Sequence, residues 1–406
     1  MSTVLRHARL VDGSTTDVLL DGDRIAAVGP GHSADSTIDL SGYVLLPSFV
    51  EPHAHLDKAL TVSRSVNRTG DLLGAIHAMN EIADGFTHTD FVRRADAALR
   101  IHLAYGTTVV RSHVNIGSTF GLRALAALVE VREAWRGVVD LELVALIGHP
   151  ILGEAGTNLK VALAEGADVA GGCPHLDPEP IAAVDTCLGI AGEAGVPLDL
   201  HTDETLNPGM LTLEHLADRV LATGFEHGVT GSHCVSLGVQ PEDVQRRMAE
   251  KIAAAGMAIV ALPQTNLYLQ GREHPVATPR GLTAVRPLLA AGATVAAGGD
   301  NLRDAFHPVG RGDALEVGAL MVTDGHLSVS DALRTLTEGG RAALRREPVA
   351  IEAGARADLV AVRAVDANEA LGAASPDRFV WSGGRLVART RVDTQLATSL
   401  DGEVAP

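Results

Sequence analysis

The sequence has few cysteines, few aromatic residues and no long apolar run, and these shortages exclude several classes of protein. Its three cysteines, Cys173, Cys187 and Cys234, are an odd number without a CxxC pair, so a disulfide-built scaffold is not expected and a reducing compartment fits. No stretch approaches about 18 apolar residues, and the N-terminus lacks the apolar core of a signal peptide, so neither a membrane span nor a secretion signal is expected. We therefore expect a cytoplasmic protein.

Positive charge is also scarce. The chain has 33 lysines and arginines against 50 aspartates and glutamates, a formal net charge of −17. Nucleic acids and anionic membranes are bound by basic faces, so neither is expected as a partner. A small-molecule partner is favoured instead, and the sequence leaves open whether the chain forms a homo-oligomer.

The middle of the chain alternates apolar strand-like runs with longer stretches of helical period. The strand-like runs are residues 48–55, 107–115, 141–148, 168–175, 197–204, 228–234, 258–264 and 294–300. Helix candidates between them include residues 91–106, 121–135, 181–195 and 241–256. Eight strand–helix repeats without a Gly-rich phosphate turn predict a (β/α)₈ TIM barrel over residues 49–344, rather than an open doubly wound sheet.

Both ends of the chain have a different pattern. Residues 1–48 and 345–406 contain short runs of β-branched residues between Asp-Gly and Gly-Gly turn signals. Because the two ends share this pattern, we expect them to meet in one small β domain, a β-sandwich outside the barrel.

Histidines and a carboxylate follow several of the expected barrel strands. His53 and His55 are two residues apart on one strand, so both side chains point the same way. His201, His233 and Asp300 lie at the ends of the fifth, sixth and eighth strands. Barrel enzymes keep their active sites at this face, so the five groups should converge there. Imidazole and carboxylate ligands suit Zn²⁺ or Fe²⁺.

Glu204 follows His201 by three residues. A carboxylate in that position can reach the mouth of the barrel without binding a metal, which favours a general acid and base beside a metal-bound water. The alternative is a loop glutamate that caps the following helix.

The order of these motifs resembles the amidohydrolase superfamily, and within it the cytosine deaminases most closely. The similar segments are LPSFVEPHAHLDK, VVRSHV, LHTDE, GSHC, NLYLQGR, RGLTAV, GGDN and the C-terminal AGARADLVAV. They occur in the same order as in the family and cover most of the chain, including the expected end sheets.

The resemblance implies one divalent transition metal per chain, zinc or iron. Relatives with two metals carry a carboxylated lysine at the end of the fourth strand, where this chain has His175 and no lysine. By position, His53, His55, His201 and Asp300 would hold the metal. The catalytic set would be Glu204, which shuttles the proton, His233, which polarises the water or ligates, and Asp300, which also takes a proton from the water.

Three positions expected to face the substrate depart from the cytosine deaminase pattern. A glutamine that reads the pyrimidine edge is replaced by Gly148, with His149 beside it. The second aspartate after the metal ligand is Asn301, and a tryptophan beyond it is Phe306. The substrate-binding candidates are therefore His149, Asn301, Phe306, Gln270 and His175.

The expected reaction is hydrolytic removal of an exocyclic amine, as ammonia, from a small nitrogen heterocycle. Cytosine is not expected to be the best substrate. Hydrolysis of a cyclic amide or an N-alkylamine on the same machinery is an alternative, since fold and metal do not fix the scissile bond. An alternative of another class is a metal-holding binding protein without turnover, against which the presence of both Glu204 and Asp300 argues.

Overall fold

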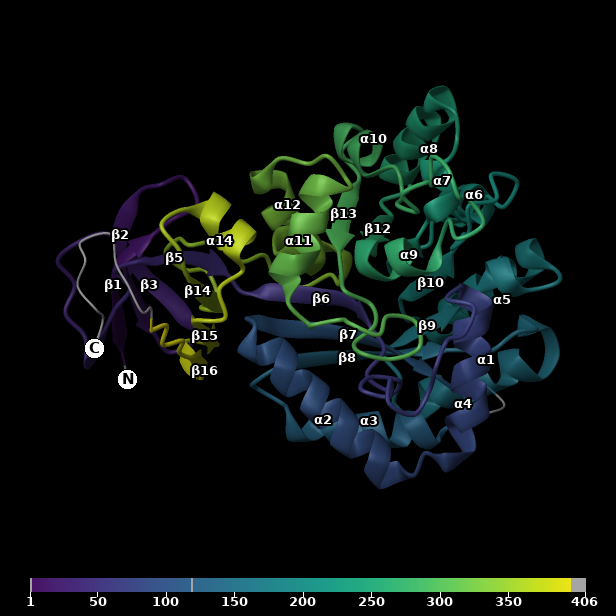
Figure 1. The fold of residues 1–406 in the computed structure, drawn as a ribbon, viewed down its shortest axis with the longest axis horizontal. Coiled ribbons are helices and arrows are strands. Elements are labelled where there is room, and N and C mark those ends of the chain that lie inside the picture. Colours follow the sequence, from purple (N-terminus) through teal and green to yellow (C-terminus); the bar gives the residue numbers. More distant parts are fainter. Residues whose placement is uncertain (1, 118–119, 396–406) are drawn as a thin grey trace.

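The chain folds into a barrel and a smaller sheet beside it (Figure 1). The structure is a computed structural model, and it describes residues 2–117 and 120–395. The last part of the expected C-terminal β segment, residues 396–406, lies outside the described residues. Within the described part, no helix is both long and apolar enough to cross a membrane.

Eight parallel strands form the barrel in chain order, which confirms the predicted (β/α)₈ fold. They are β6 (Phe49–Ala54), β7 (Thr107–Asn115), β8 (Asp140–Leu146), β9 (Val169–Gly172), β10 (Leu198–Thr202), β11 (Val229–His233), β12 (Ala258–Ala261) and β13 (Thr294–Ala297). Each begins within one residue of the start of an expected strand. The fourth ends earlier than expected, because Pro174 has no N–H for a ladder and begins a short 3₁₀ turn that contains His175.

Helices follow the strands and surround the barrel (Figure 1). They are α1 (Leu72–Ile82), α2 (His88–Ala104), α3 (Arg123–Ala134), α4 (Gly156–Ala164), α5 (Pro180–Ala194), α6 (Thr212–Thr223), α7 (Val235–Gly238), α8 (Glu242–Ala254), α9 (Pro263–Leu269), α10 (Val285–Ala290), α11 (Ala314–Thr323), α12 (Val329–Leu336) and α13 (Glu338–Ala343). The four named helix candidates correspond to α2, α3, α5 and α8. Helix α2 begins three residues earlier than expected because Thr87 accepts the N–H of Asp90 and caps it.

A buried glutamate closes the barrel between its first and last strands. Glu51 on β6 accepts the backbone N–H groups of His53 and Gly299, at 3.2 and 2.9 Å. A Cβ atom at Gly298 would stand only 2.4 Å from the Glu51 carboxylate, so this position requires glycine. Beyond it, Ala54 and Asp300 form a parallel bridge, which completes the ring at the mouth.

The interior of the barrel contains a buried ionic group below the mouth. Arg111 on β7 donates to Asp199 on β10 at 2.8 Å, to Thr230 on β11 at 3.2 Å and to Glu142 on β8. Arg111 is 2% exposed, and burial of an ion pair is tolerated only when partners of this kind satisfy both charges. The group therefore connects four barrel strands, β7, β8, β10 and β11.

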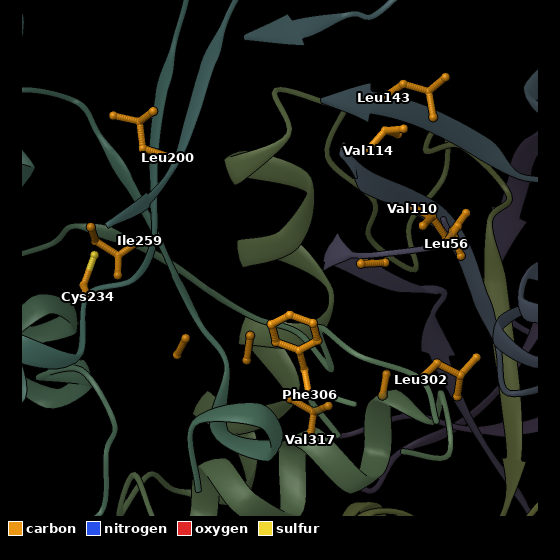
Figure 2. Packing of buried hydrophobic residues seen from close by; sticks show 14 of the residues in the cluster. Leu56, Val110, Val114, Leu143, Leu200, Cys234, Ile259, Leu302, Phe306 and Val317 are labelled. Atoms are coloured by element: carbon orange, nitrogen blue, oxygen red, sulfur yellow. The ribbon is translucent and has the colours of Figure 1, made fainter. Parts of the chain in front are cut away.

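Apolar side chains fill the space between the strands and the helices in one large cluster. Figure 2 shows part of it, including Val114, Leu143, Leu200 and Ile259 from four barrel strands. Each of the four is at most 1% exposed. Aliphatic residues supply most of this core, as the low aromatic content requires.

Strands from both ends of the chain form the small sheet. They are β1 (Thr3–Arg9), β2 (Thr15–Asp21), β3 (Arg24–Val28), β4 (Ser36–Asp39), β5 (Tyr43–Pro47), β14 (Leu359–Arg363), β15 (Arg378–Ser382) and β16 (Arg385–Thr390). Their order is β16-β15-β14-β5-β1-β2-β3, with β4 beside β1, and most pairs are antiparallel.

This sheet curls over a core of its own. Ile25 on β3 hydrogen-bonds with residues 354 and 355, just before β14, and its side chain shares a cluster with Leu5 and Trp381. The predicted β domain from both termini is therefore present beside the barrel (Figure 1). The boundaries of this domain at residues 48 and 345 stay a prediction. Helix α14 (Ala367–Ala373), which lies in the C-terminal part, packs on the barrel helices α11 and α12.

Candidate active site

The candidate site lies at the carboxyl ends of the barrel strands, where the chain turns sharply. His233 and Asp300 have φ angles of 69° and 63°, in the left-handed region that residues with a Cβ seldom adopt. Such backbone costs about 1–3 kcal/mol per residue and clusters at functional sites. The turn at each position directs the side chain toward the barrel axis.

Four of the predicted ligand groups converge there. The Nε2 atoms of His53 and His55 each lie 3.2 Å from Nε2 of His201. Asp300 Oδ1 lies 3.3 Å from Nε2 of His55 and 3.8 Å from Nε2 of His53. Two ligand atoms bound to one ion at about 2.0–2.2 Å in tetrahedral geometry stand roughly 3.3–3.5 Å apart, so these spacings fit a single metal ion.

The protonation states of these groups also suit a metal. Burial lowers the pKa values of His53, His55 and His201 well below the ordinary range, so the imidazoles are neutral and their lone pairs are free. Asp300 Oδ1 has no hydrogen-bond donor among the described residues. Buried polar atoms without partners are costly, and a cation between them removes that cost.

His113 on β7 lies beneath the cluster. Its ring stacks on the ring of His53 with 3.8 Å between centroids, and its Nε2 lies 3.6 Å from Asp199 of the buried ionic group. His113 thus links the ligand cluster to the Arg111 network in the barrel interior.

Glu204 faces the cluster rather than a helix end. The capping of α6 is done by its neighbour Asp203, whose carboxylate accepts the N–H groups of Thr212 and Leu213 at 3.0 Å each. Glu204 is 5% exposed and places Oε1 3.5 Å from Nδ1 of His233. Burial, together with the nearby charge of Asp300, raises the pKa of Glu204 well above its ordinary value, which favours the protonated form of this carboxyl group.

His233 is oriented by a second polar side chain. The side-chain amide of Asn266, on α9, lies 3.1 Å from Nδ1 of His233. The opposite ring nitrogen, Nε2, lies 3.8 Å from Asp300 Oδ2 and has no hydrogen-bond partner among the described residues. Burial lowers the pKa of His233 to about 3, which keeps this ring neutral.

A cavity of about 240 Å³ opens beside these groups. Its wall includes His55, His201, Glu204, His233 and Asp300, together with Lys58, Leu72, Ile76, Asn80, Asn115, Gly117, Phe120, Leu146, Ile147, Gly148, His149, Cys173, Leu176, Asn301 and Phe306. Of the substrate-binding candidates, Asn301, Phe306 and His149 line the cavity, and His149 is exposed at its rim.

The other two substrate-binding candidates contact the backbone near β10. His175 Nδ1 lies 3.1 Å from the carbonyl oxygen of His201, and the Gln270 amide donates to the carbonyl of Glu204 at 3.1 Å. Neither lines the cavity, so both hold the segment that carries His201 and Glu204. Their contact with a substrate stays a prediction.

Sequence reasoning did not single out Lys58 or the apolar wall formed by α1. Lys58 follows His55 by three residues in the HLDK segment, so its proximity to the ligand pair is a signal that could have found it. Leu72 and Ile76 give no comparable signal, because an apolar pair at helical spacing looks the same when it packs into a core.

Comparison with known proteins finds similarity along the whole chain. The model of the family described as "Amidohydrolase family" matches residues 87–388. A pterin deaminase from Rhizobium rhizogenes is 32% identical over 94% of this chain and 91% of the relative. The crystal structure of 5-methylcytosine deaminase from Klebsiella pneumoniae, liganded with phosphonocytosine, matches with a TM-score of 0.89 and 26% identity over 98% of this chain and 100% of that one. N-isopropylammelide isopropylaminohydrolase from Burkholderia multivorans matches with a TM-score of 0.83 and 32% identity over 96% and 98%.

Proposed function

This chain belongs to the amidohydrolase family, and we propose that it is a metal-dependent aminohydrolase that releases ammonia from a small nitrogen heterocycle. The observation that carries the proposal is the placement of a buried carboxyl group, Glu204, in the same cavity as His55, His201 and Asp300, three of the four converging ligand groups. The deaminase names of the sequence relative and the structural relative support the same reaction.

In this proposal His53, His55, His201 and Asp300 hold one divalent transition metal, zinc or iron. The neutral imidazoles and the unpartnered carboxylate oxygen support a nitrogen and oxygen ligand set, which both metals accept. A metal bound there supplies a water nucleophile at neutral pH, since it lowers the pKa of water from 15.7 to about 7. No lysine occurs in β9, which supports one metal rather than two.

In this proposal three side chains carry out the proton transfers and orient the reacting groups. Glu204 donates its proton to the ring nitrogen beside the amine-bearing carbon. It then takes up the proton of the hydroxyl group that the water has added to that carbon, while the proton taken by Asp300 leaves with the amine as ammonia. His233 presents its neutral ring to the reacting oxygen, in an orientation set by Asn266. Asp300 accepts a proton from the attacking water. The walls of the cavity exclude bulk water, because every one of these three groups is at most 5% exposed.

We further propose that the heterocycle is larger than cytosine, with two fused rings. The cavity has a volume of about 240 Å³, which leaves room beyond one six-membered ring with two small substituents. Gly148 lines the cavity where cytosine deaminases are expected to carry a glutamine, so no side chain enters the cavity from that position. The pterin deaminase relative supports a fused ring.

Hydrolysis of an N-alkylamine is a second candidate, favoured by the similarity to the isopropylaminohydrolase structure. The two reactions are separated by their products, because only deamination of a free amine releases ammonia. The apolar rim residues Leu72 and Ile76 could pack against an alkyl group.

A substrate screen on metal-reconstituted protein tests the proposal. We would measure ammonia release from aminopteridines, aminopurines, aminopyrimidines, aminotriazines and creatinine-like rings, and alkylamine release from N-alkylated triazines. Ammonia from one of the fused rings supports the proposal. Alkylamine as the sole product would favour the second candidate, and binding without any product would favour a binding protein.

A further inference from the structure

One lysine in this chain is buried in the cavity without a carboxylate partner. The sequence contains three lysines, Lys58, Lys160 and Lys251. Lys160 pairs with Glu193 at 2.7 Å, and Lys251 pairs with Glu214 and Asp218 at 3.0 and 2.8 Å. Lys58 is 5% exposed and lines the cavity, yet no carboxylate among the described residues lies within ion-pair distance of it.

Lys58 is held rigidly in the cavity wall. Arg94 on α2 donates to the carbonyl oxygens of Asp57 and Ala59, on either side of Lys58, at 2.7 and 2.9 Å. The Asp57 carboxylate accepts the backbone and side-chain N–H groups of Asn115 at 3.0 and 2.9 Å. The direction of the lysine side chain is therefore set before a ligand arrives.

The ammonium group has one close side-chain contact. Lys58 Nζ lies 4.0 Å from the centre of the Phe306 ring, which also lines the cavity. A cation above a ring face is attracted to it, but the contact satisfies none of the three N–H donors of an ammonium group. The positive charge also acts at longer range on Glu204 and Asp300, whose pKa values it lowers against the larger effect of burial.

Lys58 lines the cavity, and no acceptor among the described residues binds the N–H donors of its Nζ. A substrate that carries an acceptor into the cavity would bind them. We propose that Lys58 is a specificity-determining residue, which binds an oxo oxygen on the ring of the heterocycle. This inference rests on the proposed function, because it names a feature of the substrate of that same site.

The contents of the cavity support this inference. Glu204, His233 and Asp300 line the same cavity as Lys58 and Phe306, and the last two contact each other there. A charge-assisted hydrogen bond from Lys58 to the oxo oxygen and contact of the ring with Phe306 would fix how the heterocycle lies in the cavity. The amine would then face the reacting groups.

The test compares 2-amino-4-oxopteridine with 2-aminopteridine, which lacks the oxo group and the proton on the ring nitrogen beside it. Equilibrium binding would be measured on metal-loaded protein in a Glu204→Gln background, so that neither ligand is turned over. With Lys58 present, the oxo ligand should bind about 10- to 100-fold more tightly than its partner. Lys58→Met should abolish this preference, and should change the affinity for 2-aminopteridine by no more than about twofold.

Lys160→Met is the matched control. It removes the charge of a lysine whose side chain is 57% exposed, pairs with Glu193 and does not line the cavity. It should leave both affinities unchanged. Melting curves and metal content would verify that Lys58→Met is folded and loaded, and Lys58→Gln provides the same comparison if the methionine variant is not. Lys58→Arg should restore part of the preference, because it returns the charge.

Equal weakening of both ligands by Lys58→Met would overturn the inference, since Lys58 would then act through the charges of Glu204 and Asp300. Equal binding of the two ligands to protein with Lys58, or binding of neither, would overturn it as well. Failure of the proposed function has a different result, in which the preference for the oxo ligand is present but protein with Glu204 intact releases no ammonia.

Discussion

A Glu204→Gln substitution would remove one proton from the cavity while it keeps the volume and shape of the side chain. Glutamine can occupy the same buried place beside His233, but its amide does not release a proton to a ring nitrogen. Positioned acid and base groups contribute about 10²–10⁴-fold to a rate, which equals about 3–5 kcal/mol of activation free energy. We therefore expect kcat to fall by at least 10²-fold.

The assay would measure ammonia release with the best substrate of the screen, together with metal content and substrate affinity. The metal content should stay unchanged in Glu204→Gln, because Glu204 is not among the four groups proposed to hold the metal. The substrate affinity should also stay unchanged, because glutamine keeps the volume and shape of the side chain. Glu193→Gln is the matched control. It makes the same chemical change at a glutamate whose side chain is 68% exposed, and it should leave kcat unaltered.

Two results would refute this reasoning. Loss of the metal together with the activity would mean that Glu204 is a ligand. A kcat within tenfold of the unmodified protein, with the metal present, would mean that another group carries the proton.

The remaining predictions concern the metal, the substrate and the barrel interior. Elemental analysis of purified protein should give about one transition metal per chain, and Asp300→Asn should abolish activity; two tightly held metals would contradict the site described above. Cytosine should be a poor substrate relative to the best fused ring, and a kcat/KM near 10⁵ M⁻¹s⁻¹ or higher for cytosine would disprove this. Arg111→Met should lower the free energy of unfolding in urea by about 3–5 kcal/mol, because Asp199 and Glu142 lose their buried counter-charge. A loss below about 1 kcal/mol would show that the network is not needed for stability.

The barrel and the ligand cluster could be predicted from the sequence because their signals are local. His53 and His55 share a face through the two-residue period of a strand, and His201, His233 and Asp300 each follow an apolar run. Parallel strands in a barrel bring all their carboxyl ends to one face. Placement on strand ends was therefore enough to bring the five groups together.

The rest of the site depends on contacts that sequence spacing does not encode. Two adjacent carboxylates, Asp203 and Glu204, have opposite surroundings, and only the structure shows that Asp203 takes the helix end while Glu204 faces the cavity. His175 and Gln270 were expected at the mouth by position, but a 3₁₀ turn and helix α9 carry them to backbone carbonyls instead. Likewise, only the structure shows that Lys58 has no ion-pair partner among the described residues.

The small sheet has a consequence for how the chain is made. Strand β5 pairs with β14 along five residue positions, yet about 310 residues separate the two strands in the chain. At a synthesis rate of about 5–20 residues per second, β5 waits roughly 15–60 s on the ribosome for its partner. During that time its buried residues Val44, Leu45 and Leu46 form an open apolar edge, the kind of strand that pairs with other chains. The first strands to be synthesised are thus among the last to be completed, and the yield of soluble protein should depend on how well this edge is protected before β14 emerges.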